Sequence, residues 1–525
     1  MPKFKPYNYN QTSMVIINYE DQLQTGTFEH AVHHLINNKL DLSIFHHKYN
    51  NESAGRLAYD PAILLKIILF AYSKGITSSR EIQWCCESNI IFKALSCDAV
   101  PHFTTIASFV SGNSKEIEQI FEQVLLICNE EGLLGNELFA IDGCKISSNA
   151  SKEWSGTFKE LEQKRKKIRK QIRHHLKEHK KTDNNDTRDE QRRKRSQKAI
   201  ETLNKAHDKI DKFLKSASPR MGNGKRQREV KSNITDNESA KMKTSKGTIQ
   251  GFNGLATTDK KNQIIVDAQV FGDGQEHHTL QPILESVKEK FSRLGISDDI
   301  YKDGTIITAD TGFANEDNMK YLQENDINAY IPDNQFRSRD PKFKDQKDKY
   351  GKRNQNNRKS NNSKKFTSDD FDFEPENQSC TCPAGNAMWL KNEAKDKHGN
   401  QKIFFEGRLT DCRNCNLKHK CMRNPDSANT RKGSGRQVSF ITANNSKSRT
   451  PHTDWMKQRV DSDYGKLIYS HRMSVVEPVF ANIGTNKGLN RFSLRGKTKV
   501  QGQWLLYCLV HNIEKIQKYG DMAVN

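Results

Sequence analysis

Three carboxylate residues stand at points where the chain changes from apolar to polar. Asp142 and Asp310 each follow a mainly apolar run and precede a glycine-containing turn. Such junctions place an acid at the carboxyl end of a buried strand, where open α/β sheets usually carry their chemistry. Glu477 precedes Pro478, which disfavours a helical conformation at the residue before it and predicts a kink or a new turn there. Carboxylates without histidine or thiol partners suit Mg²⁺ or Mn²⁺.

Each acid also has a simpler interpretation. Asp-Gly after a strand is often only a turn, so Asp142 alone does not define a site. Glu477 could be an ordinary acid at a helix start, stabilised by the helix dipole. The sequence leaves these alternatives open.

Five of the eleven cysteines lie close together in the chain: Cys380, Cys382, Cys412, Cys415 and Cys421. Cys412-x-x-Cys415 has the spacing of a structural zinc site, and Cys380 with Cys382 could complete a tetrahedral set. Cys421 or His419 is an alternative ligand, and unpaired thiols in a small insertion are the alternative to a metal. A closed thiolate site would hold the insertion together and would not be catalytic.

The charge balance points to a polyanionic partner. The 525 residues include 85 Lys+Arg and 64 Asp+Glu, a net charge of +21. Nucleic acid is the first candidate and an anionic membrane the second. The N-terminus lacks the apolar core of a signal peptide, and no apolar run approaches the ~20 residues of a spanning helix. We therefore expect a cytosolic protein without a membrane partner.

The patterning predicts four parts. Residues 1–135 read as an all-helical domain, which we expect to bind DNA. Residues 136–158, 233–333 and 461–520 alternate strands with helices and predict an α/β domain with a mixed sheet flanked by helices. Residues 159–232 are strongly basic with coiled-coil spacing, which predicts an inserted helical hairpin that turns at 182–186. Residues 334–460 form a second insertion, with the cysteines and a polar segment, 340–363, that we expect to be mobile.

Cations gather before the last apolar helix, at residues 500–516. They are Lys487, Arg491, Arg495, Lys497 and Lys499. Basic residues just ahead of a helix N-terminus form a good phosphate-binding stretch.

Several stretches carry a family resemblance: DPAILLKIILFAYSKGITSSREI and PHFTTIASF, then AIDGCKISSNAS, TDNESAKMKTSKGTIQGFNG, TADTGFANEDN and YSHRMSVVEPVFANIGTNKGLNRFSLRGKTKV. In these stretches the chain resembles bacterial insertion-sequence transposases of the DDE superfamily, whose catalytic domain has a ribonuclease H-like fold. The VEPVF and LRG stretches are specific to one branch of these enzymes.

The resemblance implies that Asp142, Asp310 and Glu477 are the catalytic and metal-binding acids. It also implies that Tyr469 and Arg472 contact DNA. Two Mg²⁺ or Mn²⁺ ions, ~3.5–4 Å apart, would activate a water or a 3′-hydroxyl and stabilise the leaving oxygen. The reactions would be hydrolysis at the ends of the element and transfer of the freed strand to target DNA. A homodimer on two DNA ends, in the nucleoid of a bacterial cytoplasm, is the expected state.

One position departs from the family. Most relatives carry a lysine two helical turns after the glutamate, and here that position is Gly484. Lys487 is the nearest substitute for contact with the DNA end. Two alternative functions remain: a structure-specific nuclease on the same fold, and a catalytically impaired DNA-binding regulator, which Gly484 favours.

Overall fold

The computed structural model describes residues 16–49, 57–182, 190–222, 227–245, 247–343, 365–395, 401–430, 432–443 and 450–521. The chain divides into two compact units. The first comprises residues 1–334 and 455–525, and the second comprises residues 335–454.

The first unit begins with six α-helices: α1 (Phe28–Asn38), α2 (Pro61–Ser73), α3 (Ser79–Ser88), α4 (Ile90–Ser96), α5 (Phe103–Gly112) and α6 (Ser114–Glu130). Asp60 caps α2 by accepting a hydrogen bond from the amide of Ala62, and Pro61 occupies the first helical position. The apolar stripe of α6 is buried, as its spacing requires.

The centre of this unit is a six-stranded sheet: β1 (Leu138–Ser147), β4 (Ala240–Thr244), β5 (Gly247–Asp259), β6 (Ile265–Phe271), β7 (Ile306–Ala309) and β8 (Ala329–Tyr330). The order is β4-β5-β1-β7-β8, and β6 pairs with β5 beside β4. β1 pairs parallel with β7 and antiparallel with β5, so β5 alone runs against the other strands. This mixed sheet confirms the predicted α/β, ribonuclease H-like class.

Helices cover both faces of the sheet. On β1, Leu138 and Ala140 pack against Val475 and Val476 of α18 (Asp463–Ala481), whereas the ring of Phe139 packs against that of Phe291 in α9 (Leu280–Arg293). Successive strand residues point to opposite faces, so α18 and α9 lie on opposite sides of β1. Helices α10 (Glu316–Glu324) and α17 (Pro451–Asp461) complete this part.

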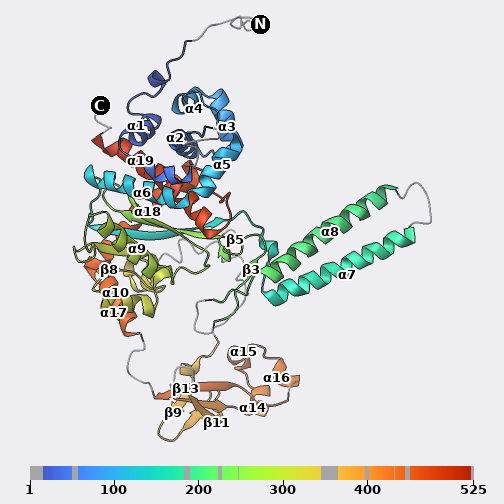
Figure 1. Ribbon diagram of the computed structural model, residues 1–525. Helices are drawn as coiled ribbons and strands as arrows, with labels where there is room; N and C mark the ends of the chain where they lie inside the picture. The colour runs from blue at the N-terminus through green and yellow to red at the C-terminus, as the bar shows by residue number, and fades with distance from the viewer. Residues whose placement is uncertain are drawn as a thin grey trace, which may run out of the picture. The chain divides into compact units, whose positions relative to one another are not determined.

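The last helix, α19 (Lys497–Tyr519), joins the sheet to the N-terminal helices (Figure 1). The indole nitrogen of Trp504 donates to the carbonyl of Leu255 in β5, and the side chain of Asn512 bonds both backbone groups of Ile265 in β6. Elsewhere on α19 the ring of Tyr507 lies 4.9 Å from that of Tyr72 in α2. The helical region and the sheet therefore share one core.

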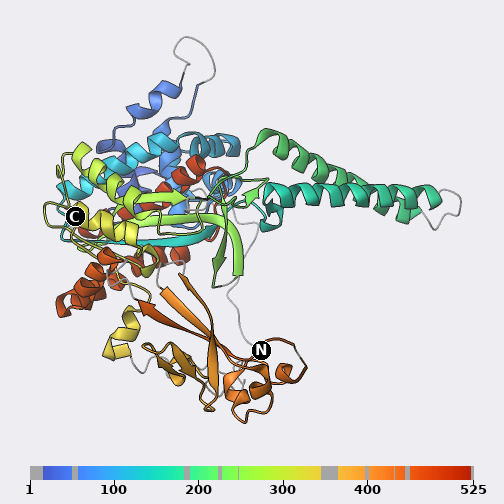
Figure 2. The same cartoon turned by 90° about the horizontal axis from the view of Figure 1, so that it is seen from below.

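The basic segment forms two helices, α7 (Phe158–Thr182) and α8 (Glu190–Ser216). They run side by side in both views (Figure 1, Figure 2) around a core that includes Leu161, Ile168 and Ile210. The two-stranded ribbon β2 (Ser155–Gly156) and β3 (Ser232–Asn233) closes the base of this hairpin. Most of the predicted turn, residues 183–186, lies outside the described residues.

The second unit contains a five-stranded antiparallel sheet in the order β13-β12-β11-β10-β9. Its strands are β9 (Asp372–Glu374), β10 (Ser379–Thr381), β11 (Ala387–Lys395), β12 (Gln401–Glu406) and β13 (Gln437–Ala443). Three short helices lie between β12 and β13: α14 (Leu409–Arg413), α15 (Lys418–Cys421) and α16 (Ser427–Thr430). Most of the polar segment predicted to be mobile, residues 344–363, lies outside the described residues.

Within the described part of the chain, no helix combines the length and the apolar character needed to cross a bilayer.

Candidate active site

The strand register places Asp142 and Asp310 at neighbouring positions. The last paired residues of the parallel strands β1 and β7 are Ile141 and Ala309, and each acid is the next residue of its strand. β7 ends there, and Asp310 opens the short turn η5 (Thr311–Phe313). The two carboxylates thus lie side by side at the edge where β7 ends. The predicted strand end at Asp142 is wrong, because β1 continues through Gly143 to Ser147 and stays paired with β5.

Asp142 is held by a cation. Its Oδ2 lies 2.8 Å from Nη2 of Arg472 on α18, and its Oδ1 accepts a hydrogen bond of 2.8 Å from the amide of Gly143. Burial raises the pKa of the Asp142 carboxyl, while Arg472 opposes this shift and the nearby carboxylates Asp310 and Glu276 add to it. Arg472 therefore limits the rise in the pKa of Asp142 that burial causes.

Glu276 is an acid at this edge that the sequence patterns did not single out. It lies between β6 and α9, close to Gly312, which follows Asp310 by two residues. If Gly312 carried a Cβ atom, that atom would lie only 2.6 Å from the Glu276 carboxylate. Its Oε1 accepts a 3.3 Å hydrogen bond from Asn253 and lies 3.7 Å from Nζ of Lys145. The signal was the same one that marked the other two acids, a strand that ends in a polar, glycine-containing turn.

The chemistry of these groups fits a hard divalent cation. Asp142, Asp310 and Glu276 offer only oxygen donors, which Mg²⁺ and Mn²⁺ prefer. The Oδ1 atom of Asn253, a fully buried residue, has no hydrogen-bond partner among the described residues and lies close to Gly143. Among the described residues, however, no three His, Cys, Asp or Glu side chains already converge closely enough to hold a metal ion.

Glu477 lies on α18 but on its exposed side. It follows Arg472 by five residues, so the side chains of Glu477 and Arg472 point in directions about 140° apart around the helix axis. Arg472 is the residue that contacts Asp142. The carboxylate of Glu477 makes no hydrogen bond or ion pair with any described residue. Of the three predicted acids, the structure brings together Asp142 and Asp310.

No new helix begins at Glu477, because α18 continues through Pro478 to Ala481, and the predicted kink stays a prediction. A proline leaves the carbonyl four residues earlier without its helical donor. Here the side chain of Gln263 donates to that carbonyl, on Ser474, at 3.0 Å. The chain then adds one π-type turn, η8 (Asn482–Asn486).

The predicted DNA-contact residues of α18 and η8 occupy different environments. Tyr469 is half-buried and Arg472 is buried against Asp142. Lys487 is 1% exposed, and its Nζ lies 2.6 Å from both carboxylate oxygens of Glu514 on α19. Lys487 is thus part of an internal ion pair and is not presented to solvent.

The remaining predicted cations are exposed: Arg491, Arg495, Lys497 and Lys499. The Nε atoms of Arg491 and Arg495 donate to the carbonyls of Ser148 and Asn149, just beyond β1. These two arginines therefore lie beside the end of the strand that carries Asp142.

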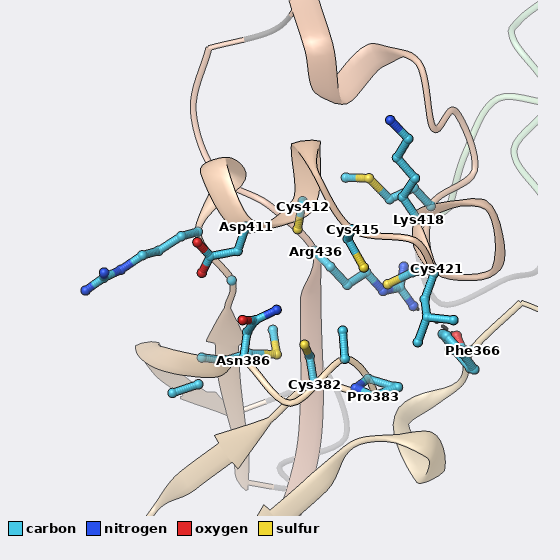
Figure 3. A pocket seen from close by; sticks show the side chains of 17 residues that line it. Phe366, Cys382, Pro383, Asn386, Asp411, Cys412, Cys415, Lys418, Cys421 and Arg436 are labelled. Atoms are coloured by element: carbon cyan, nitrogen blue, oxygen red, sulfur yellow. Dashed lines mark hydrogen bonds between the residues drawn. The ribbon is translucent and has the colours of Figure 1, made fainter.

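In the second unit, Cys382, Cys412, Cys415 and Cys421 line one cavity (Figure 3). Cys380 is not in its lining, because its thiol is buried 4.0 Å from the sulfur of Met388 in the core of the sheet. The alternative ligand His419 is also absent from the lining.

Family comparisons match two separate parts of the chain. A transposase DDE domain matches residues 381–517, which include α18, Glu477 and most of α19. A transposase domain (DUF772) matches residues 17–112, which include α1 to α5. No curated protein matches the chain. With the ribonuclease H-like sheet between these regions, the two matches support the assignment of the chain to the DDE transposases of insertion sequences.

Proposed function

We propose that this transposase binds the ends of its element, cleaves a DNA strand there and joins the freed 3′ end to target DNA. The observation that carries the proposal is the register of β1 and β7, which sets Asp142 and Asp310 side by side at one edge of the sheet. Paired carboxylates at such an edge suit phosphoryl transfer assisted by divalent cations.

Asp142 and Asp310 would hold Mg²⁺ or Mn²⁺, with Glu477 as the third acid. When bound, the ions would stabilise the negative charge that develops on the reacting phosphate and favour the deprotonated form of the attacking water or hydroxyl. Arg472 would position Asp142 and limit the rise in the pKa of its carboxyl. Among the described residues no hydrogen bond or ion pair holds the Glu477 carboxylate, and a rotation of α18 would be needed to turn it towards the pair.

The exposed cations would bind the DNA backbone. Asp142 and Ser147 are five strand residues apart, about 17 Å, which corresponds to about five nucleotides along one strand. Arg491 and Arg495, beside this end of β1, are therefore placed to hold phosphates about five nucleotides from the scissile bond. Two such chains, each bound to one end, would form the active dimer.

The test is cleavage of DNA that carries the terminal repeats, in Mg²⁺, by Asp142→Asn, Asp310→Asn and Glu477→Gln variants. Each should lose on the order of 100-fold or more in rate, since each removes charge at the reacting phosphate. Glu324→Gln is the matched control, because Glu324 lies on the exposed side of α10 in an ion pair with Lys320. Near wild-type cleavage by all three variants would refute the assignment.

A joining assay with labelled ends and a target plasmid separates transposition from simple cutting. A transposase yields joint molecules, whereas a structure-specific nuclease yields cleaved ends only. A protein that binds the ends but cuts neither substrate would be a regulator.

A further inference from the structure

We propose that the second unit binds one structural zinc ion through Cys382, Cys412, Cys415 and Cys421. These four thiols come from two segments that are far apart in the chain. Cys382 lies in the turn between β10 and β11, and the other three lie on and around α14 and α15. Figure 3 shows their sulfur atoms around one space between that turn and the two helices.

The space between the thiols suits a metal ion. Its volume is about 40 Å³, and its walls include the apolar side chains of Phe366, Pro383, Leu417 and Met422. A water needs two to four polar partners, which such walls supply poorly. Soft thiolates select zinc, and four of them form the usual closed, tetrahedral site.

The buried side chain of Arg436 is a second, independent observation that favours negative charge at the cavity. The Nε atom of Arg436, which lines the cavity, is buried and has no hydrogen-bond partner among the described residues. Arg436 also lies within electrostatic range of Cys421. Zinc-bound cysteines are thiolates, and the two extra negative charges of a four-thiolate site would provide the acceptor that this N–H lacks.

The metal would stabilise a segment of the second unit that has only a small hydrophobic core of its own. The segment with α14, α15 and α16 buries a cluster of only Leu409, Met422 and Ala428, with Cys412 and Cys421 at its edge. Cys382 and Cys421 also border the separate core of the sheet. So small a cluster contributes little stability, and small units commonly add a metal for this reason. Zinc at the cavity would link the two cores.

The four thiols are not yet at coordination distance from one common point. Among the described residues, no three His, Cys, Asp or Glu side chains lie close enough together to hold a metal ion. Zinc–sulfur bonds are about 2.3 Å long, so binding would pull the four sulfur atoms inward. The cavity leaves the room in which side-chain rotation can achieve this.

The test uses the full-length chain, stripped of metal under reducing conditions and reloaded with zinc alone. Wild-type protein should retain one zinc ion after desalting. Cys382→Ser and Cys412→Ser should each weaken zinc binding by at least about 10- to 100-fold, since even loss of an outer partner costs that much. Cys380→Ala is the matched control, because its thiol belongs to the same unit but not to the cavity, and it should retain the ion.

Cobalt provides a readout that does not depend on how the variants fold. Wild-type protein loaded with Co²⁺ should show sulfur-to-cobalt charge transfer and the strong visible absorption of tetrahedral cobalt. Two results would overturn the proposal: wild-type protein that retains no zinc and gives no such spectrum, or a Cys380→Ala variant that loses zinc as fully as Cys412→Ser does. Because neither measurement involves DNA, the outcome is independent of the proposed catalytic site.

Discussion

Arg472 and Asp142 form an ion pair of 2.8 Å between α18 and β1, with side chains 9% and 25% exposed. The pair links the helix that carries Glu477 to the strand that carries the first acid. Because Arg472 and Glu477 both lie on α18, a movement of this helix that brings Glu477 towards the sheet edge would also move Arg472 relative to Asp142. We infer that Arg472 positions Asp142, while the predicted contact of Arg472 with DNA stays a prediction.

Replacement of Arg472 by glutamine should shift the pH dependence of cleavage. Burial already raises the pKa of Asp142, and Arg472 counteracts the rise. Without the arginine the pKa rises further, so Asp142 ionises only at higher pH and the acid limb of the cleavage profile moves upward. Rates measured across the pH range at saturating Mg²⁺ check this. An unchanged acid limb with a uniformly lower rate would mean that Arg472 acts on DNA alone.

Glu276→Gln should weaken the response to Mg²⁺. Its carboxylate lies beside Gly312 and adds negative charge at Asp142. Loss of such a nearby group typically costs about 10- to 100-fold in metal affinity or activity. The Mg²⁺ concentration at half-maximal cleavage should rise, while thermal stability should change little.

Glu289→Gln serves as the control for this variant, because Glu289 is an exposed acid on the neighbouring helix α9. If the two variants required the same Mg²⁺ concentration for half-maximal cleavage, Glu276 would not contribute to metal binding.

Local patterns predicted the end of β7 at Asp310, because a strand that delivers an acid to a turn is visible in a few consecutive residues. The end predicted at Asp142 is wrong, because pairing with β5 extends β1 to Ser147. The sheet and the positions of Asp142 and Asp310 follow from such local patterns. Features that depend on distant partners could not be predicted. Pro478 is accommodated by Gln263, and Lys487 is buried by Glu514, 27 residues later. Glu276 was missed because its own turn contains several polar residues, and only the packing beside Gly312 distinguishes it.

Gly484→Lys should strengthen binding of the DNA ends. Gly484 lies in η8, about two turns after Glu477, and a Cβ atom there would meet no atom within 4 Å. A lysine can therefore be added without a clash, and one new phosphate contact should steepen the salt dependence of binding by about one unit. Thr485→Lys adds the same charge at the next position, which faces another direction. Equal gains in both variants would show a general charge effect.

Arg495→Ala should weaken DNA binding regardless of sequence. Its Nε holds the backbone at Asn149, and its exposed guanidinium carries charge to the surface beside β1. Loss of one phosphate contact should lower the slope of log affinity against log salt by about one unit. Lys320→Ala, an exposed cation on α10, should leave the slope unchanged. A fall in affinity with no change in slope would indicate a disturbed loop and not a lost phosphate contact.

His511 should make the first unit sensitive to acid. The ring is buried in α19, where Nε2 bonds the carbonyl of Gln263 and Nδ1 bonds the side-chain amide of Asn482. Burial lowers the pKa of His511 to about 3, against 6.5 for the free side chain. Between these values the unfolded chain binds a proton that the folded chain does not. The stability is therefore complete above about pH 6.5 and is lost as the pH falls towards 3, by up to about 1.4 kcal/mol per pH unit.

Denaturant unfolding of the full-length protein at pH 7.5, 6 and 5 checks this dependence, with His511→Gln as the comparison. Glutamine can keep a hydrogen bond to Gln263 but cannot take up a proton, so the variant should lose less stability than wild type between pH 7.5 and 5. Its stability at pH 7.5 should be somewhat lower, because the shorter side chain fills the site less well. If the two proteins lost the same stability over this interval, the acid sensitivity would arise from other groups and His511 would not be its source.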